Sequence, residues 1–386
     1  MSGLDERLAR LGLRAPRYDG AHLGTLLPAL ADALGAPGDP AARAALGIER
    51  CERAVVVLVD GMGLGNLAER SGHAPFLRSL LAESGPGLTS SFPTTTASAL
   101  GLFGTGRPGG LTGLVGYAAR NPRTGGLATF VSWEGAPPAE EWQREPRLLT
   151  ELAASGIEVT SVGPARFEGS GLTVAALAGG RYLAAEDPAQ RVDAVVRQLR
   201  RPGLVYLYWG ELDKVGHAQG WQSGAWGAAL EELDAELSRL ARSLSRGTSL
   251  LVTADHGMVD VDPAARLDLA AHPAARADMA LLGGEPRALH VYLREGVDPV
   301  EARGRWQAEL GEDVVVATRE EVLDAGWFGT VAEHVEPALG DLLVVTGGRT
   351  TVVDTLGPTA GLAGMVGVHG SLTPTEVEVP LIQVRA

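Results

Sequence analysis

Reactive side chains of two kinds are nearly absent from the 386-residue sequence. Cys51 is the only cysteine and Lys214 the only lysine. A single cysteine excludes an intramolecular disulfide framework and any zinc site built mainly from thiolates. A single lysine, which is not part of a Gly-Lys-Ser/Thr motif, excludes a Walker P-loop and most mechanisms that need a lysine Schiff base.

Basic residues and long apolar runs are scarce as well. The chain has 33 Lys and Arg residues against 47 Asp and Glu residues, a formal net charge of −14. The overall field of such a chain does not attract a nucleic-acid polymer or an anionic membrane, so a phosphate-bearing ligand needs a local cation such as a metal ion. Residues 1–16 contain no signal-peptide core, and no run of about 18 apolar residues occurs. We therefore expect a cytoplasmic protein.

The composition is that of an ordinary globular protein, with 45% apolar and 21% charged residues. Apolar runs typical of buried parallel strands lie at 54–59, 158–162, 204–209 and 250–253. Helical patterns alternate with them at 145–154, 188–200 and 226–245. This alternation predicts an α/β fold in which helices cover both faces of a largely parallel central sheet.

Two segments differ from this core. Residues 1–50 are expected to form an N-terminal helical arm packed on the core, with a helix near 23–34. Residues 262–340 contain shorter elements and are expected to form a small inserted lid or subdomain. The core then comprises residues 51–261 and 341–386, including strands near 342–345 and 350–353.

Aspartate and histidine residues follow three of the apolar runs. They are Asp60 after the first run, Asp213 and His217 after the third, and Asp255 and His256 after the fourth. Ligand sites in parallel sheets form at the carboxyl ends of the strands, so we expect these side chains to converge. His369, in a glycine-flanked loop, can add another imidazole.

Each of these residues also has an ordinary interpretation. An Asp after a strand is often a helix cap, and a loop His is usually a surface group, the role expected of His22, His73, His272, His290 and His334. Convergence after three strands favours a metal site instead. Mixed carboxylate and imidazole ligands favour Zn²⁺, with Mn²⁺ as the alternative. Three Asp and three His are too many for one tetrahedral ion, so two ions fit the count better.

A hydroxyl-rich turn, Ser90 to Ser98, lies between the first two groups of candidate ligands. Its simplest role is to cap a helix through Thr94 or Thr95. Its functional role would be to direct one hydroxyl at the metal ions, because coordination lowers the pKa of a hydroxyl and a helix N-terminus favours a phosphate.

These features together resemble one family. The segments that carry the resemblance are, in order, VVVLVDGMG, SSFPTTTASALGLFGTGRPGG, LYWGELDKVGHAQG, VTADHGM and GVHGSLTPTEVEVPLI. They are similar to the type I phosphodiesterase/nucleotide pyrophosphatase family of the alkaline phosphatase superfamily, from about Ala54 to the end of the chain. The resemblance implies an alkaline-phosphatase-like fold, two divalent metal ions and a phosphorylated threonine intermediate.

The resemblance also assigns roles to single residues. It implies that Asp213, His217 and His369 hold one ion and that Asp60, Asp255 and His256 hold the other. The Thr-Gly pair at 105–106 fixes the register and points to Thr96 as the nucleophile and a further metal ligand, with Thr95 as the second choice.

Two departures from the family pattern bear on the substrate. Many relatives have an Asn, which helps hold a phosphoryl oxygen, where this chain has Tyr117. We expect Tyr117 to contact the substrate, either through its hydroxyl or by stacking on a base. Phosphomonoesterases of the superfamily place an Arg soon after the nucleophile, but here the next Arg is Arg107. A less charged diester is therefore expected.

The leading substrate prediction is cyclic di-AMP. The short lid, Tyr117 and the Arg-rich composition are similar to actinobacterial members of the family, which include cyclic di-AMP phosphodiesterases that form the linear dinucleotide and AMP. A general nucleotide pyrophosphatase and a phosphonoacetate-type hydrolase are the alternatives.

A Rossmann dinucleotide-binding module is disfavoured because Asn66 replaces its third glycine. A non-catalytic sensor is disfavoured by the complete ligand set. The sequence leaves the oligomeric state open.

Overall fold

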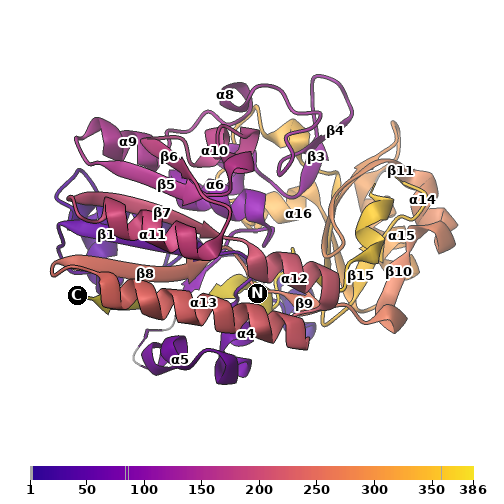
Figure 1. The fold of residues 1–386 in the computed structure, drawn as a ribbon. Helices are drawn as coiled ribbons and strands as arrows, with labels where there is room; N and C mark the ends of the chain where they lie inside the picture. The colour runs from indigo at the N-terminus through magenta and orange to yellow at the C-terminus, as the bar shows by residue number, and fades with distance from the viewer. Residues whose placement is uncertain (1–2, 83, 86, 358) are drawn as a thin grey trace.

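The computed structural model describes residues 3–82, 84–85, 87–357 and 359–386 (Figure 1). Within these residues a six-stranded sheet forms the core, in the order β18–β8–β1–β7–β5–β6. Its strands are β1 (Arg53–Val59), β5 (Val159–Gly163), β6 (Arg181–Ala184), β7 (Gly203–Trp209), β8 (Thr248–Ala254) and β18 (Ile382–Arg385). Only β18 is antiparallel to its neighbour. The predicted, largely parallel sheet is therefore confirmed.

The three middle strands of this sheet end level with one another. Val59, the last residue of β1, lies opposite Trp209 of β7 and Ala254 of β8. The residues that follow these strands therefore leave the sheet at one carboxyl edge. The middle strand is a continuous apolar run because both of its faces are covered, and every residue of 54–59 is fully buried.

Helices cover both faces of the central sheet. Side chains alternate along β7, so Tyr206 and Trp209 lie on opposite faces. The Tyr206 ring packs on Phe103 of α6 (Thr96–Thr105), with ring centroids 5.6 Å apart. On the other face, the guanidinium of Arg191 from α11 (Pro188–Gln198) lies 5.9 Å from the Trp209 ring centroid. In Figure 1, α11 and the long helix α13 (Gly224–Ser243) cross in front of the sheet.

A second sheet lies beside the core, on the right in Figure 1. Its antiparallel strands are β11 (Met279–Glu285), β12 (Ala288–Leu293), β13 (Val314–Thr318) and β14 (Leu342–Thr346). They share a separate apolar core with α14 (Pro273–Asp278) and α15 (Pro299–Leu310). The sheet does not end at residue 340, the boundary that we expected for the insert. It continues into β14 because that strand pairs with both β12 and β13.

The N-terminal segment contains α1 (Gly3–Arg10), α2 (Leu26–Ala33) and α3 (Pro40–Ala45). The helix expected near 23–34 is preceded by a separate 3₁₀ turn, Leu23–Thr25, because Pro28 has no N–H with which to continue the α-helical pattern back to residue 24. The buried side chain of Leu8 in α1 belongs to the main core. Arg7 donates a hydrogen bond of 2.7 Å to the carbonyl of Val316 in β13. The segment therefore contacts the second sheet as well as the core.

Shorter elements complete the fold. The other α-helices are α4 (Leu64–Glu69), α5 (Pro75–Leu81), α7 (Gly109–Thr112), α8 (Ala139–Trp142), α9 (Leu148–Ala154), α10 (Gly171–Ala176), α12 (Glu211–Gln219), α16 (Arg319–Asp324) and α17 (Pro374–Val377). Short strand pairs join β2 (Leu88–Thr89) to β17 (Glu378–Val379), β3 (Ala118–Arg120) to β4 (Leu127–Thr129), β9 (Val259–Asp260) to β16 (Gly367–Val368), and β10 (Arg266–Asp268) to β15 (Thr351–Val353). In the described part of the chain, no helix is both long and apolar enough to cross a membrane.

Candidate active site

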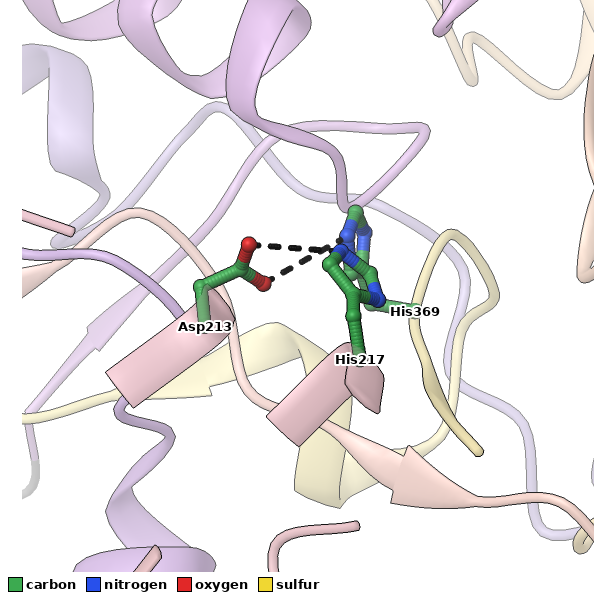
Figure 2. A group of neighbouring side chains, drawn as sticks. All are labelled: Asp213, His217 and His369. Atoms are coloured by element: carbon green, nitrogen blue, oxygen red, sulfur yellow. Dashed lines mark ion pairs between the residues drawn. The ribbon is translucent and has the colours of Figure 1, made fainter. Parts of the chain in front are cut away.

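The carboxyl edge of the central sheet brings the predicted Asp and His residues together in two clusters. The first cluster consists of Asp213, His217 and His369, whose candidate ligand atoms all lie within 4.8 Å of one another. Asp213 and His217 are one turn apart on α12, which follows β7, and His369 follows β16. Figure 2 shows the two imidazoles close together, facing the carboxylate of Asp213. His217 Nε2 lies 3.2 Å from Asp213 Oδ2, and His369 Nε2 lies 3.9 Å from Asp213 Oδ1.

The second cluster consists of Asp60, Asp255 and His256, which directly follow β1 and β8. Its candidate ligand atoms are also within 4.8 Å of one another, and all three residues are buried. His256 Nε2 lies 3.5 Å from Asp60 Oδ1 and 3.4 Å from Asp255 Oδ2. The two clusters are adjacent, because the imidazoles of His256 and His369 stack with their ring centroids 3.7 Å apart.

The imidazole rings are all oriented in the same way. The Nδ1 atoms of His217 and His369 lie 2.8 Å from the carbonyl oxygens of Gly367 and Thr94. The Nδ1 atom of His256 lies 3.1 Å from the carbonyl oxygen of Gly257. A carbonyl can only accept, so each Nδ1 carries the proton and donates it. The Nε2 atoms face the carboxylates, and Nε2 is therefore the nitrogen of each ring that would bind a metal.

The carboxylates have matching free oxygens. Oδ1 of Asp60, Oδ1 of Asp213 and Oδ2 of Asp255 are buried and have no hydrogen-bond partner. Each of these oxygens faces an imidazole Nε2, and a metal cation between them would bind both the oxygen and the deprotonated nitrogen. The residues present therefore fit two divalent ions, and the nitrogen and oxygen donors suit Zn²⁺ or Mn²⁺.

The remaining carboxylate oxygens are held by the protein. Tyr208 donates its hydroxyl to Oδ2 of Asp60. Oδ1 of Asp255 accepts the backbone N–H groups of Gly61, at 3.1 Å, and of His256, at 2.9 Å. These bonds fix both carboxyl groups so that one oxygen of each stays free toward the cluster.

Burial and the neighbouring charges shift the pKa values of Asp60 and Asp213 in opposite directions. Burial raises the pKa of Asp60 well above its usual range, and the nearby charges of Asp213 and Asp255 add to this shift. Burial also opposes the ionisation of Asp213. There, however, the facing imidazoles, chiefly that of His217, outweigh burial and lower the pKa to about 2. In the absence of bound ions, burial thus disfavours the ionised form of Asp60, whereas the imidazoles favour the ionised form of Asp213.

The three threonines of the hydroxyl-rich turn have different surroundings. Thr94 donates its hydroxyl to the carbonyl of Ser371 at 2.8 Å, which connects the turn to the loop after His369. Thr95 occupies the N-cap position of α6, but its side chain makes no capping hydrogen bond, contrary to the cap we expected from Thr94 or Thr95. Thr96 begins the helix, and its Oγ1 lies 3.3 Å from Nε2 of His256. Thr96 is therefore the threonine hydroxyl placed at the second cluster.

A pocket of about 300 Å³ opens beside both clusters. Tyr117, predicted to contact the substrate, is one of its lining residues. The aromatic lining residues are Tyr117, Phe167, Tyr182, Tyr206 and Tyr208. None of the lining residues is Lys or Arg, and none is Trp. The other histidines lie outside the clusters. His22 and His290 are not the surface groups we expected, because both are buried. His290 contacts the carbonyl of Val115 and accepts the N–H of Gly340, and His22 accepts the N–H of Gly24.

Sequence reasoning missed several pocket residues. Tyr208 lies within an apolar strand, so it resembled a core residue. The only signal that it could be near the site was its position five residues before Asp213. Phe167 and Tyr182 lie in segments without a recognisable motif. Glu285 comes from the second sheet, and burial raises the pKa of its carboxyl to about 8. Nothing in the sequence around Glu285 indicated that it would reach the central sheet.

The fold and the clusters define a class of protein, the alkaline-phosphatase-like metal-dependent hydrolases. The model of the type I phosphodiesterase / nucleotide pyrophosphatase family matches residues 54–372, and the chain belongs to this family. It is accordingly an enzyme that hydrolyses phosphoric diesters.

Solved structures of similar fold include two enzymes. Murine ectonucleotide pyrophosphatase/phosphodiesterase 5 is 16% identical, with a TM-score of 0.65 over 86% of this chain and 87% of that chain. Phosphonoacetate hydrolase from Sinorhizobium meliloti 1021, in complex with phosphonoformate, is 22% identical, with a TM-score of 0.65 over 86% of this chain and 90% of that one. An inactive threonine-to-alanine variant of the murine protein has been solved in complex with AMP, with a TM-score of 0.66 and 16% identity over 86% of this chain and 87% of that chain. At these identities the likeness shows the fold alone.

Proposed function

We propose that this enzyme is a two-metal phosphodiesterase that cleaves a nucleotide phosphodiester, with cyclic di-AMP as its substrate. The observation that carries the proposal is the placement of the Thr96 hydroxyl at two adjacent Asp/His clusters, beside a pocket with aromatic walls and no cationic side chain. The chemistry at the clusters supports cleavage of a phosphate ester, and the pocket supports a nucleotide as its carrier.

Each cluster has a defined role in this proposal. Asp213, His217 and His369 would hold one ion, and Asp60, Asp255, His256 and the Thr96 hydroxyl would hold the other. When bound, the two ions would lower the pKa of the Thr96 hydroxyl and offset the charge on the phosphate oxygens. The protein fixes the free carboxylate oxygens and the orientation of the imidazole rings in advance, so few groups need to move when the ions bind.

Thr96 is proposed to act as the nucleophile. Its Oγ1 forms a bond to the phosphorus and loses its proton to water, the phosphorus–oxygen bond to the leaving sugar breaks, and the leaving sugar oxygen takes up a proton from water. The product is a nucleotidyl group on Thr96. Water then hydrolyses that ester, which frees the nucleotide and restores the hydroxyl. The position of Thr96 at the start of α6 adds the partial positive charge of a helix N-terminus to the phosphate site.

The pocket favours a singly charged diester. A terminal or second phosphate would need a Lys or Arg, and the residues lining the pocket include neither. Phe167, Tyr182 and Tyr208 provide aromatic surfaces for a base, and Tyr117 is the proposed additional contact to the substrate. Each phosphodiester of cyclic di-AMP carries one negative charge, and opening the ring gives a linear dinucleotide that the same site can cut to AMP. This substrate implies a cytoplasmic enzyme.

The test is chromatography of cyclic di-AMP after incubation with the purified protein and Mn²⁺ or Zn²⁺. We expect conversion to the linear dinucleotide and AMP, and its loss in Thr96→Ala. Ser98→Ala is the matched control, because Ser98 is on the same helix, is buried and does not line the pocket. Thr96→Ala with near wild-type activity would move the nucleophile to Thr95 or to water.

Other substrates separate the alternatives. Cleavage of bis-p-nitrophenyl phosphate without cleavage of cyclic di-AMP would retain the phosphodiesterase and reject this substrate. Preferred cleavage of a dinucleoside polyphosphate would favour a general nucleotide pyrophosphatase, and release of phosphate from phosphonoacetate would favour a phosphonate hydrolase.

A further inference from the structure

The pocket contains an acidic residue that belongs to neither ligand cluster. Glu285 is the last residue of β11, at the tip of the β11–β12 hairpin. It lines the pocket although it comes from the second sheet, and only 5% of it is exposed. A buried carboxyl group at this position needs a physical explanation, because burial of an unpaired acid is unfavourable.

The two carboxyl oxygens of Glu285 have different surroundings. Oε2 accepts a hydrogen bond of 3.1 Å from the backbone N–H of Tyr117. Oε1 is buried and no hydrogen bond satisfies it, although the side chain of Thr95, which also lines the pocket, lies close enough to the carboxyl group to lower its pKa against the effect of burial. A buried polar atom without a partner often marks a position that a ligand completes. One oxygen therefore fixes the carboxyl group, and the other remains available.

Glu285 lies next to the loop that carries His369. A Cβ atom on Gly370 would lie only 2.6 Å from Cγ of Glu285, and the Gly370 φ of +127° is one that other residues rarely adopt. Glycine at this position therefore permits the close approach of the loop and the hairpin. On its other side Glu285 contacts Tyr117, which also lines the pocket. The carboxyl group is thus beside the loop that carries His369 and belongs to the lining of the pocket.

The charge of the pocket limits what Oε1 of Glu285 can bind. Because the lining contains no Lys or Arg, an anionic substrate group beside Glu285 would have no cationic side chain to pair with. A hydroxyl fits better, since it can donate to the ionised carboxylate and can accept from the protonated acid. In a nucleotide, the hydroxyls nearest the phosphate are those of the sugar.

We propose that Glu285 is a specificity-determining residue that binds a ribose hydroxyl of the substrate beside the reacting phosphate. This inference rests on the proposed nucleotide phosphodiesterase activity and assigns part of its specificity to the second sheet. Arg287, two residues later, holds the hairpin in place through a buried ion pair with Glu376, at 2.8 Å from both carboxylate oxygens. The hairpin is therefore a fixed wall that can recognise a sugar.

The test compares a substrate with a sugar and one without. Adenylyl-(3′→5′)-adenosine and bis-p-nitrophenyl phosphate are both diesters, and only the first has ribose hydroxyls. We expect Glu285→Ala to lower the ratio of their kcat/KM values about ten- to hundredfold, because the hydroxyl loses its partner. Glu285→Gln, which keeps an acceptor for the Tyr117 N–H, is expected to lower it less. Glu295→Ala removes an exposed carboxylate just after β12 and should keep the wild-type ratio.

Analogues of the dinucleotide that lack the 2′- or the 3′-hydroxyls identify the group. The analogue without the bound hydroxyl should be cleaved equally well by the wild type and by Glu285→Ala. An equal loss on both diesters would make Glu285 a structural residue and overturn the proposal, as would a difference that persists with every analogue. Wild-type protein that cleaves the aryl diester but not the dinucleotide would overturn the sugar contact alone. Wild-type protein inactive on both would overturn the proposed function with it.

Discussion

The two sheets contribute to one site in different ways. In the central sheet, parallel strands of matching register deliver Asp60 and Asp255 at the same level, so proximity follows from the topology. In the second sheet, a hairpin tip extends toward the pocket and delivers Glu285, and its placement depends on a buried ion pair between Arg287 and Glu376. The difference teaches that most of the candidate metal ligands follow from the sheet that defines the fold, whereas the proposed substrate contact comes from an attached element.

The largest expected effect on activity comes from a substitution of a candidate metal ligand that follows the central sheet. Asp255→Asn keeps the shape of the side chain but replaces an acidic acceptor with a neutral amide at a site of several carboxylates and imidazoles. We expect diesterase activity to fall below detection in a chromatographic assay, while the circular dichroism spectrum stays that of the wild type.

The control for this substitution is a residue of α15, the helix that packs on the second sheet. Asp298→Asn changes the exposed N-cap of α15 and should leave activity intact. A chelator should reproduce the loss in the wild type, and added Mn²⁺ or Zn²⁺ should reverse it. Activity that resists both Asp255→Asn and the chelator would contradict the proposed metal site.

The next effect concerns the stability of the junction between the sheets. Arg287→Ala would leave the carboxylate of Glu376 buried without its charge partner, and removing one member of a buried pair costs about 3–5 kcal/mol. The free energy of unfolding in urea measures the loss. Arg305→Ala, which removes a more exposed arginine paired with Asp278 in the same region, should cost far less. Comparable losses would mean that the hairpin is held by other contacts.

A smaller effect is expected from the hydroxyl that holds Asp60. Tyr208→Phe removes the donor to Asp60 Oδ2 and should weaken metal binding about ten- to hundredfold, because such supporting bonds orient a ligand. Equilibrium dialysis with Zn²⁺ or Mn²⁺ gives the affinity without an activity assay. Tyr182→Phe is the matched control, since the Tyr182 hydroxyl donates to the carbonyl of Pro164, and its metal affinity should match the wild type.

The smallest expected effect is a pH dependence of protein stability that comes from Glu285, the residue that the second sheet contributes to the pocket. Burial raises the pKa of Glu285 to about 8, so the folded protein holds a proton there that the unfolded chain releases near its ordinary pKa of 4.5. Stability from this group is therefore full below about pH 4.5 and is lost as the pH rises toward 8. Metal-free Glu285→Gln should gain stability relative to the wild type between pH 5 and pH 9 in thermal melts. A constant difference across this range would show that Glu285 is ionised in the folded protein.

Much of the central sheet could be predicted because its signals are local. Buried parallel strands are continuous apolar runs, and the residues after them share an edge whatever helices intervene. Asp213 and His217 are four residues apart in the sequence, a spacing that shares one face of a helix, and α12 places them one turn apart. The hydroxyl-rich turn gave a less complete prediction, because its sequence could not show that Thr94 bonds the loop after His369 while Thr96 faces a cluster.

The second sheet could not be read in the same way. The extent of an antiparallel sheet depends on which strands pair, and β14 pairs with β12 across about 50 residues of chain. Glu285 lies in a segment with no motif. Its approach to the pocket depends on Gly370, which lies 370 − 285 = 85 positions later in the sequence. Contacts of this kind are set by tertiary packing and leave no periodic pattern in the sequence.

The position of His369 has a consequence for how the chain is held together. Its partners Asp213 and His217 precede the second sheet, whereas His369 follows it, and 369 − 217 gives a separation of 152 residues. An ion bound by all three would act as a cross-link that closes this long loop and restricts the unfolded ensemble. An ion bound to the first cluster would then connect the segment before the second sheet, which carries Asp213 and His217, to the segment after it, which carries His369.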